Sequence, residues 1–292
     1  MKKLLFFTML SHFCYAQDEA SIIKNVTWET TKLGKKFYWK RIHFKQKELF
    51  NANQSINMLE ISLNNKKVKF GFATVDSMKA DPKIKRFLQK TSKIAADLGA
   101  IAAVNAGFFD MKNGGAVDFL KIGGKTVDTT RLSNVARLPF HSISGVIIDK
   151  NKVSIIKGEQ KLGWEKNLTQ ENVLLTGPLL MFNGEMEELS KTPFNDNRHP
   201  RTCACVTNDK KLLLITVDGR SAESFGMTLA ELRTIAKALD CKDAINFDGG
   251  GSTTMYIKGQ PESGVVNYPS DNKLFDHAGE RPVSNVFYLK LR

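Results

Sequence analysis

Residues 228–252 read TLAELRTIAKALDCKDAINFDGGGS, and this stretch decides the class of fold that the chain adopts. Thr228, followed three residues later by Glu231, fits a capping box, which is the signal that begins an α-helix. A short apolar strand, 244–247, comes next and runs directly into Asp248 and three glycines. A helix beside a strand that ends in a polar turn predicts α+β architecture. The helix has one apolar face, formed by Leu229, Leu232, Ile235, Ala236 and Leu239.

Apolar segments of strand length recur on both sides of this stretch. No internal repeat or long linker divides them, so we expect a single compact α+β domain with a mixed or antiparallel sheet and a few packed helices. Its expected bounds are 56–292, and residues 17–55 are an N-terminal extension or opening strands around Phe37-Tyr38-Trp39. The expected strands are 58–63, 68–75, 100–104, 143–148, 153–156, 173–175, 179–182, 203–206, 212–217, 255–257 and 283–289.

Two turn signals before residue 105 predict local structure. Asn64-Asn65 lies between two alternating apolar segments, which favours a β-hairpin between 58–63 and 68–75. Asp81-Pro82 offers an N-cap followed by proline at the first helical position, and Gly99 offers a C-terminal stop. We therefore predict a helix that begins near Asp81 and ends before Gly99.

The first 16 residues have the pattern of a signal peptide. Lys2 and Lys3 precede a short apolar run at 4–10, and small residues, Cys14 and Ala16, stand before Gln17. The run is too short for a membrane-spanning helix, which needs about 20 residues. We expect cleavage after Ala16, no transmembrane segment after cleavage, and an exported protein in the periplasm or outside the cell.

Composition excludes several classes of protein. The 292 residues are 42% hydrophobic and 25% charged, which is a globular profile and not that of a disordered chain. The formal net charge of +13 raises the question of acidic partners, but the lysines and arginines are spread thinly. Without a basic cluster or interleaved aromatic residues we expect no nucleic-acid partner.

Three cysteines remain once Cys14 has left with the leader. Cys203 and Cys205 are two residues apart in a predicted strand, so they face the same side and do not suit a bridge with each other. An odd number excludes a disulfide framework but leaves room for one bridge with Cys241. No CxxC pair exists, and buried, small apolar side chains are the favoured interpretation for all three.

The polar residues of greatest interest follow apolar strands. Ligand sites of sheets that pack with helices gather at such positions. Three consecutive glycines allow backbone amides to approach an anion, and arginine and histidine side chains would add charged donors. The candidates are Asn105, Asp110, His199, Arg201, Asp218, Arg220, Asp248, Gly249, Gly250, Gly251 and Ser252.

Each candidate also has a structural interpretation. Asp218-Gly219 suits a hairpin turn, and His199 before a proline is often an ordinary loop residue. Asp110 suits an Asx turn. Asn246 lies within a strand and can point into the core as readily as toward a ligand. Glu231 belongs to the helix cap and not to catalysis.

The ordered series NAGFFD, HPRT, TVDGR, GMTLAEL, INFDGGGSTTM and RPVSN resembles the phosphodiester glycosidase family. The resemblance runs from about Asn105 to the C-terminus, whereas 17–55 shows none. It implies hydrolysis of the bond between the anomeric carbon of a sugar and a phosphodiester oxygen. Arg201, Arg220 and the amides of 249–251 would then hold phosphate, and Asn105 would bind sugar hydroxyls.

Glycoside hydrolysis ordinarily uses two carboxylates, so Asp218 and Asp248 are the predicted catalytic pair. His199 is an alternative proton carrier, because the ordinary pKa of histidine lies near 6.5. We expect no obligatory cofactor. Ca²⁺ or Mg²⁺ held by Asp110, Asp218 or Asp248 stays open as an alternative, because these cations prefer oxygen ligands.

Three classes of function therefore compete. The first is an exported glycosidase that cleaves the anomeric C–O bond of a sugar-1-phosphodiester, with α-linked N-acetylglucosamine as the candidate sugar, in an envelope glycan or exopolysaccharide. The second is a phosphodiesterase that cleaves P–O at the same anion site. The third is a non-catalytic protein that binds or assembles exopolysaccharide. The paired carboxylates, the histidine and the arginines favour the enzymes.

Overall fold

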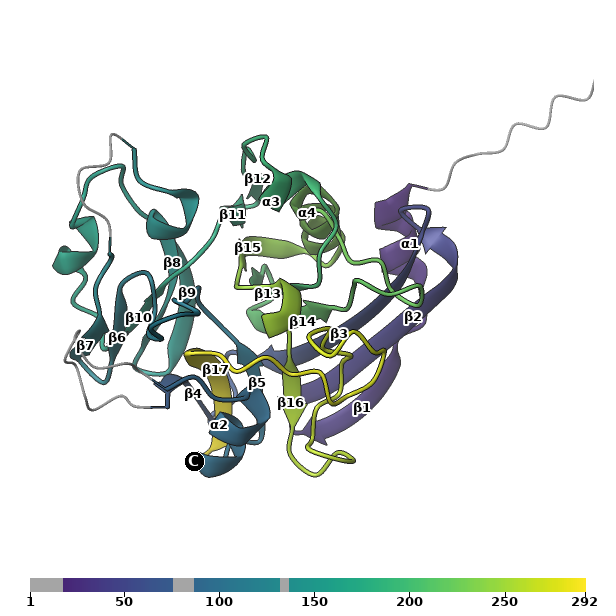
Figure 1. Cartoon of the computed structure of the whole chain (residues 1–292), viewed down its shortest axis with the longest axis horizontal. Coiled ribbons are helices and arrows are strands. Elements are labelled where there is room, and N and C mark those ends of the chain that lie inside the picture. Colours follow the sequence, from purple (N-terminus) through teal and green to yellow (C-terminus); the bar gives the residue numbers. More distant parts are fainter. Residues whose placement is uncertain (1–17, 76–86, 132–136) are drawn as a thin grey trace, which may run out of the picture.

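Three antiparallel sheets dominate the computed structural model, which describes residues 18–75, 87–131 and 137–292 (Figure 1). This architecture of antiparallel sheets with a few helices confirms the predicted α+β class. The predicted signal peptide lies outside the described residues, as does the predicted helix start at Asp81-Pro82. Among the described residues, no helix has the length and apolar character needed to cross a membrane.

The largest sheet has eight strands in the order β1-β2-β3-β14-β13-β15-β11-β12. The last five strands in this order come from the second half of the chain. The boundary predicted between residues 55 and 56 falls inside β3, so the opening strands are part of this sheet. The strands are β1 (Glu29–Gly34), β2 (Phe37–Leu49), β3 (Ala52–Ser62), β14 (Lys211–Val217), β13 (Arg201–Thr207), β15 (Cys241–Asn246), β11 (Leu179–Phe182) and β12 (Glu185–Met186).

Two smaller sheets complete the strands. The five-stranded sheet forms the lobe on the left of Figure 1 and has the order β7-β6-β10-β8-β9. The four-stranded sheet has the order β16-β5-β17-β4. Their strands are β7 (Lys125–Asp128), β6 (Leu120–Ile122), β10 (Asn172–Leu175), β8 (Ser144–Asp149), β9 (Lys152–Lys157), β16 (Met255–Ile257), β5 (Ala102–Asn105), β17 (Asn285–Leu291) and β4 (Val68–Thr74).

Short helices and turns connect and cover these sheets. The capping box predicted at the start of α4 is confirmed: Thr228 Oγ1 accepts from the Glu231 N–H, and the Glu231 carboxylate accepts from the Thr228 N–H. The helices are α1 (Glu19–Asn25), α2 (Thr91–Asp97), α3 (Pro193–Asp196) and α4 (Leu229–Ala238). The 3₁₀ turns are η1 (Phe140–Ser142), η2 (Trp164–Asn167) and η3 (Gly250–Ser252).

The central strands of the eight-stranded sheet are buried on both faces. Along β14, Leu212 and Leu214 face a core shared with the two smaller sheets, whereas Leu213 and Ile215 face a second core beneath α1 and α4. Successive side chains of a strand point to opposite faces, which explains this division. Burial on both sides also explains why these strands read as nearly continuous apolar runs.

The predicted hairpin at Asn64-Asn65 is wrong. Both strands exist, but β3 pairs with β2 and β14, whereas β4 pairs with β17 in the four-stranded sheet. The segment between β3 and β4 therefore carries the chain from one sheet to another. Alternation of apolar residues predicted the two strands, but it carries no information about their partners.

The helix predicted to end before Gly99 ends there, but it begins later than expected. The helix α2 starts at Thr91, and Gly99 follows it with a φ of +64°. Gln89 instead forms a β-bridge with Val283, exchanging both backbone hydrogen bonds. This pairing holds the chain before Thr91 in an extended conformation.

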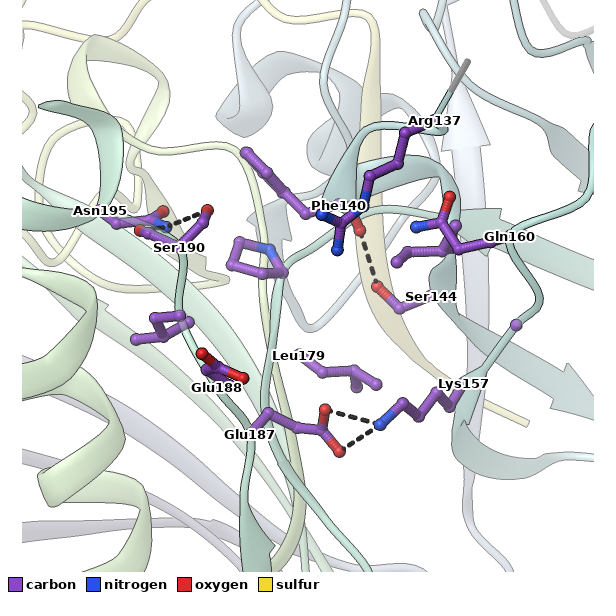
Figure 2. Close-up of a pocket in the computed structure, with 14 residues that line it drawn as sticks. Arg137, Phe140, Ser144, Lys157, Gln160, Leu179, Glu187, Glu188, Ser190 and Asn195 are labelled. Atoms are coloured by element: carbon purple, nitrogen blue, oxygen red, sulfur yellow. Dashed lines mark hydrogen bonds and ion pairs between the residues drawn. The ribbon is translucent and has the colours of Figure 1, made fainter. Parts of the chain in front are cut away.

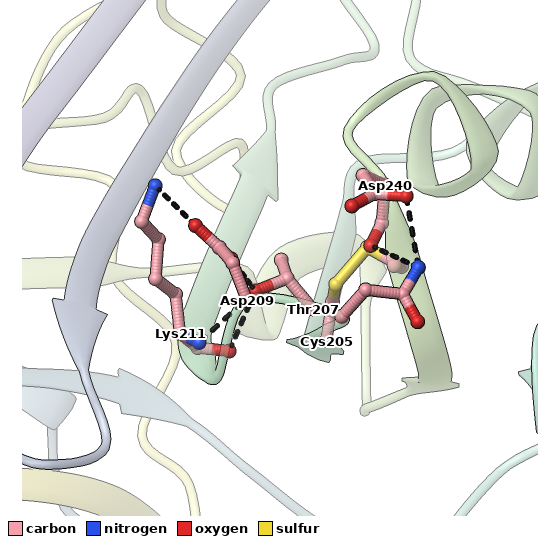
Figure 3. Close-up of a disulfide and its surroundings, with 7 residues drawn as sticks. Cys205, Thr207, Asp209, Lys211 and Asp240 are labelled. Atoms are coloured by element: carbon pink, nitrogen blue, oxygen red, sulfur yellow. Dashed lines mark hydrogen bonds and ion pairs between the residues drawn. A yellow bond between two sulfur atoms is a disulfide. The ribbon is translucent and has the colours of Figure 1, made fainter.

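A disulfide joins Cys205 on β13 to Cys241 on β15 (Figure 3). The expectation of three free, buried cysteines is therefore wrong for two of them, and the single-bridge alternative is the one found. Cys203 keeps a free, buried thiol, and burial raises its pKa to about 12. The sequence could not select this pair, because the pairing of β13 with β15 is what brings the two residues together.

We predict that replacing both Cys205 and Cys241 by alanine lowers the free energy of unfolding by about 2–4 kcal/mol, because the bridge closes a loop with a sequence separation of 36. Urea denaturation monitored by fluorescence measures the change. As a control, dithiothreitol should destabilise the wild type and leave the double variant unchanged. Equal stability of the two proteins under oxidising conditions would contradict the prediction.

Candidate active site

The peptide of Asp248 is held from both sides by the loop that leaves β5. Its N–H donates to the Ala106 carbonyl at 2.8 Å, and its carbonyl accepts from Asn105 Nδ2 at 2.6 Å. Asn105 is fully buried, and its Oδ1 accepts from Thr202 Oγ1 and from the Thr254 N–H. All of these hydrogen bonds are internal, so Asn105 positions Asp248 and does not present its amide to a sugar hydroxyl.

Glycines allow three backbone segments to meet beside Asp248. The Gly250 N–H donates to the Pro200 carbonyl at 2.8 Å, and a Cβ on Gly249 would lie 2.7 Å from that same oxygen. Gly226, at φ +82°, packs equally closely on the carbonyl of His199. A side chain at either glycine would separate the segments, so the spacing of His199-Pro200 from the turn at 249–251 depends on glycine.

The Asp248 carboxyl is partly exposed at the end of β15. Burial raises its pKa to about 6, and this rise is opposed by the Ser252 side chain, the Gly249 N–H and the charge of Arg281. Its Oδ1 accepts from the Gly249 N–H at 2.9 Å. A partly exposed aspartate whose pKa lies this close to neutrality suits acid–base or nucleophilic chemistry.

Two arginines pack against the glycine turn that follows Asp248, and the charge of one of them, Arg281, acts on the carboxyl. Arg220 is exposed, and a Cβ on Gly250 would lie 2.9 Å from its Nη2. Arg281 packs against Gly251 and binds Asp271 through two hydrogen bonds, at 2.5 and 3.1 Å. Arg220 has a φ of +66°, a left-handed conformation that a non-glycine residue adopts at a cost and that is frequent at functional sites.

Asp218 occupies a different environment from its predicted partner. It is fully buried, and its carboxylate accepts from Ser55 Oγ at 2.7 Å, Asn267 Nδ2 at 2.9 Å and the Tyr268 N–H at 2.8 Å. Burial raises its pKa, whereas these donors oppose the rise. The hydrogen bonds join β3, β14 and the segment after β16, which is a structural role. The geometry therefore does not present Asp218 as a second reactive carboxylate.

Arg201 differs from its predicted role, whereas the role predicted for His199 stays a prediction. The Arg201 guanidinium is buried and donates to the carbonyls of Met227, Phe194 and Asn197, so it supports the fold and is not presented to phosphate. Burial lowers its pKa to about 10. His199 is partly exposed, and burial together with the charges of Arg201 and Arg220 lowers its pKa. The lowered pKa favours the neutral form of its imidazole.

The remaining predicted residues have local roles. Asp110 forms the Asx turn considered above: its Oδ1 accepts from the N–H groups of Lys112 and Asn113, and these contacts lower its pKa. Asn246 is buried and donates to the carbonyls of Gly177 and Phe247. Asp110, Asp218 and Asp248 are not gathered, and the described residues contain no group of three or more metal-ligating side chains.

Sequence reasoning missed a histidine and a carboxylate near this site. His141 Nδ1 lies 2.6 Å from Asp118 Oδ2, and Ser142 Oγ donates to Asp118 Oδ1 at 2.5 Å. The His141 ring also lies 5.5 Å from the ring of Phe108, in the loop that holds Asp248. No motif marked these residues. Arg281 was missed too, although it opens the quoted RPVSN segment.

A cavity of about 570 Å³ lies between the five-stranded sheet and the α3 region (Figure 2). Phe140 and Asn195 line one side, and the Lys157–Glu187 ion pair closes another. Its wall contains none of the predicted site residues, although Phe140 adjoins His141. We place the chemistry at Asp248 and not in this cavity, because the accessible carboxyl and its cations gather there.

Comparison with known proteins identifies the family of this chain. The model of the phosphodiester glycosidase family matches residues 98–290. The chain belongs to the phosphodiester glycosidase family. The match spans β5 and everything C-terminal to it except the last two residues, so it includes Asp248, the glycine turn, both flanking arginines and the His141–Asp118 pair.

Two curated relatives are named for the same enzyme activity. A Bos taurus N-acetylglucosamine-1-phosphodiester alpha-N-acetylglucosaminidase is 30% identical over 190 residues, covering 60% of this chain and 33% of that protein. The Mus musculus counterpart is 24% identical over 185 residues, covering 61% and 35%. This chain thus spans about a third of the length of these relatives.

Solved structures share the fold. The catalytic domain of zebrafish N-acetylglucosamine-1-phosphodiester alpha-N-acetylglucosaminidase, auto-inhibited by its pro-peptide, superposes with a TM-score of 0.67 at 20% identity, covering 91% of this chain and 89% of that one. A hypothetical protein from Synechocystis gives 0.63 at 15% identity, covering 91% and 64%. Both alignments extend well beyond the family match.

We predict opposite consequences for the two aspartates. Asp218→Ala should lower the free energy of unfolding by about 3 kcal/mol, because it leaves three buried donors without an acceptor. Asp248→Asn should change stability by less than about 1 kcal/mol, because burial already disfavours the charged carboxyl. Urea denaturation of both variants measures this contrast. Equal destabilisation would refute the assignment of different roles.

We also predict that Asp248 titrates near pH 6 and that Arg281→Met raises its pKa further, because the Arg281 charge favours the carboxylate. Carbonyl-detected NMR of ¹³C-labelled aspartate, assigned through Asp248→Asn, measures both values. Arg41→Met is the matched control, since Arg41 pairs with Glu29 on the outer strands of the eight-stranded sheet. An unchanged pKa in Arg281→Met would show that the two groups are not coupled.

Proposed function

We propose that this protein hydrolyses the anomeric C–O bond of a sugar-1-phosphodiester, with α-linked N-acetylglucosamine as the candidate sugar. Membership of the family supports a glycosidase-like hydrolase, and the names of the bovine and mouse relatives suggest the sugar. The observation that carries the proposal is the partly exposed Asp248, whose carboxyl has a pKa of about 6 and which precedes a glycine turn contacted by Arg220 and Arg281.

The cations suit an anionic substrate. Arg220 is exposed beside Gly250, so its guanidinium is the donor best placed to bind a phosphodiester. Arg281 is half-buried and held by Asp271, and it adds a fixed positive charge. The two positive charges at the glycine turn would draw in the phosphate, and the charge of Arg281 favours ionised Asp248 above pH 6.

The leaving group simplifies the chemistry. A phosphate released from the anomeric carbon is already a stable anion, so little protonation of the leaving oxygen is needed. The demand falls on stabilising an oxocarbenium-like centre and on delivering water. Ionised Asp248 would meet the first demand from beside the anomeric carbon, with Asn105 and Ala106 fixing its backbone.

We further propose that the protein acts outside the cytoplasm, on an envelope glycan or exopolysaccharide. The basic and apolar start of the chain supports export, as does the Cys205–Cys241 disulfide, since disulfides persist in oxidising compartments.

An NMR time course with a panel of sugar-1-phosphodiesters, including UDP-N-acetylglucosamine, tests the reaction on protein that begins at Gln17. Free sugar together with an intact phosphate product is the expected result. Sugar-1-phosphate would mean P–O cleavage and would overturn the proposal. Saturable binding of an acidic polysaccharide without any turnover would instead identify a binding protein.

We predict that Arg220→Ala lowers kcat/KM for a sugar phosphodiester by about 10–100-fold, because a hydrogen bond to a charged group contributes about 1.5–3 kcal/mol. Arg220→Lys should recover part of the loss, since lysine restores the positive charge but not the planar pair of donors of the guanidinium. Arg41→Ala, on the outer part of the eight-stranded sheet, is the control. A loss of the same size on a neutral aryl glycoside would show that Arg220 does not act on phosphate.

A further inference from the structure

The His141–Asp118–Ser142 cluster has the form of a proton-transfer device. Asp118 is 2% exposed and lies behind the imidazole, whose side chain is 24% exposed. Because Asp118 Oδ2 lies 2.6 Å from Nδ1, the carboxylate accepts the Nδ1 proton and leaves the Nε2 lone pair on the opposite side of the ring. The Ser142 hydroxyl donates to the other oxygen, Oδ1, and so fixes the carboxylate.

The cluster is joined to the Asp248 site through the backbone. The loop that leaves β5 holds the Asp248 peptide with Asn105 and Ala106, and it then supplies both Phe108 and Asp118. Within this loop the Val117 N–H donates to the Phe108 carbonyl at 3.1 Å, which joins the backbone just before Asp118 to the residue whose ring contacts His141.

A second connection runs through the segment before β11. A Cβ on Gly177 would lie 3.3 Å from the Cα of His141, and the Gly177 carbonyl accepts from Asn246 Nδ2 at 3.0 Å. Asn246 is two residues before Asp248 on the same strand end. Both connections bring the backbone at His141 into the same region as the end of β15, which Asp248 follows.

Aromatic rings frame the imidazole. Phe108 lies 5.5 Å from it at a tilt of 55°, and Phe140 lies 5.4 Å from it nearly perpendicular. These contacts limit rotation of the ring. A histidine needed only for packing would not require a buried carboxylate behind it, because a neutral imidazole in a partly exposed position can hydrogen-bond to water.

We propose that His141 is the proton acceptor for the attacking water and that Asp118 is its positioning residue. The inference rests on the proposed function and assigns a base to it. Asp218 is committed to internal hydrogen bonds, so the site presents one carboxyl and one carboxylate-backed imidazole instead of two carboxylates.

In the proposed step, the oxygen of water forms a bond with the anomeric carbon, and the bond from that carbon to the phosphate oxygen breaks. The bonding electron pair leaves with the phosphate oxygen, and one water proton moves to Nε2 of His141. Asp118 stabilises the imidazolium that forms. The imidazolium then releases its proton to solvent, which restores the neutral ring.

His141→Ala tests the proton acceptor. Its kcat should fall by about 10²–10⁴-fold, the usual contribution of general acid–base catalysis, and added imidazole should restore part of the rate. His43→Ala is the matched control, because His43 is also a partly exposed histidine with one hydrogen bond, to the Glu223 carbonyl, and lies on β2. The thermal midpoint of each variant checks folding.

The test of Asp118 uses measurements that would not change if this residue had only a structural role. Asp118→Asn should lower kcat by about tenfold or more with KM nearly unchanged, and Asp118→Glu should recover part of it. Independently of turnover, the downfield ¹H NMR signal of the His141 Nδ1 proton should be present in the wild type and absent from Asp118→Asn.

The outcomes separate the two proposals. If the wild type releases sugar and His141→Ala keeps most of that rate, the inference about His141 is overturned and the proposed function survives. If the wild type releases nothing from any phosphodiester, both are overturned. Turnover lost in His141→Ala, restored by imidazole and retained in His43→Ala would support the assignment.

Discussion

The peptide of Asp248 is the constraint on which the rest of the site depends. Its N–H and C=O are both bound by the loop after β5, at Ala106 and Asn105, so the end of a strand in the eight-stranded sheet is fastened to the end of a strand in the four-stranded sheet. The Gly250 N–H adds a third connection, to Pro200. These hydrogen bonds fix the direction in which the carboxyl leaves the backbone.

Asp218 and Asp248 are the same type of residue, but their different environments give them different roles. Asp218 is enclosed and satisfied by three donors, and it stabilises the junction of β3 and β14 with the segment after β16. Asp248 is partly exposed, with a raised pKa and arginines on both sides of its turn. Because of this difference, the proposed mechanism uses one carboxylate and one histidine instead of the predicted pair of carboxylates.

Local sequence signals predicted those features of the fold that depend on residues close to one another in the sequence. The capping box of α4, the apolar strands and the Asp248 turn all follow from spacing and composition. The partners of β3 and β4 did not follow, because pairing between distant strands leaves no local trace. The same reason explains the missed disulfide pair and the false hairpin.

The candidate site was predicted unevenly for related reasons. Asp248 and Arg220 lie beside glycines that indicate a turn, so the sequence marked them as candidates. Asp118 and His141 are 23 positions apart, and neither lies in a recognisable motif, so only the folded loop after β5 brings them to the same place. Arg201 was misjudged because an arginine that precedes an apolar strand gives no sign that its guanidinium will bind backbone carbonyls.

Hydrolysis in ¹⁸O-labelled water tests the central claim most directly, because the account places the attack at the anomeric carbon. Mass spectrometry of the phosphate product, after turnover of a sugar-1-phosphodiester, reads out which bond has broken. The account predicts a phosphate product without ¹⁸O, since the water oxygen goes to the sugar. A phosphate product that carries ¹⁸O would mean attack at phosphorus and would contradict it.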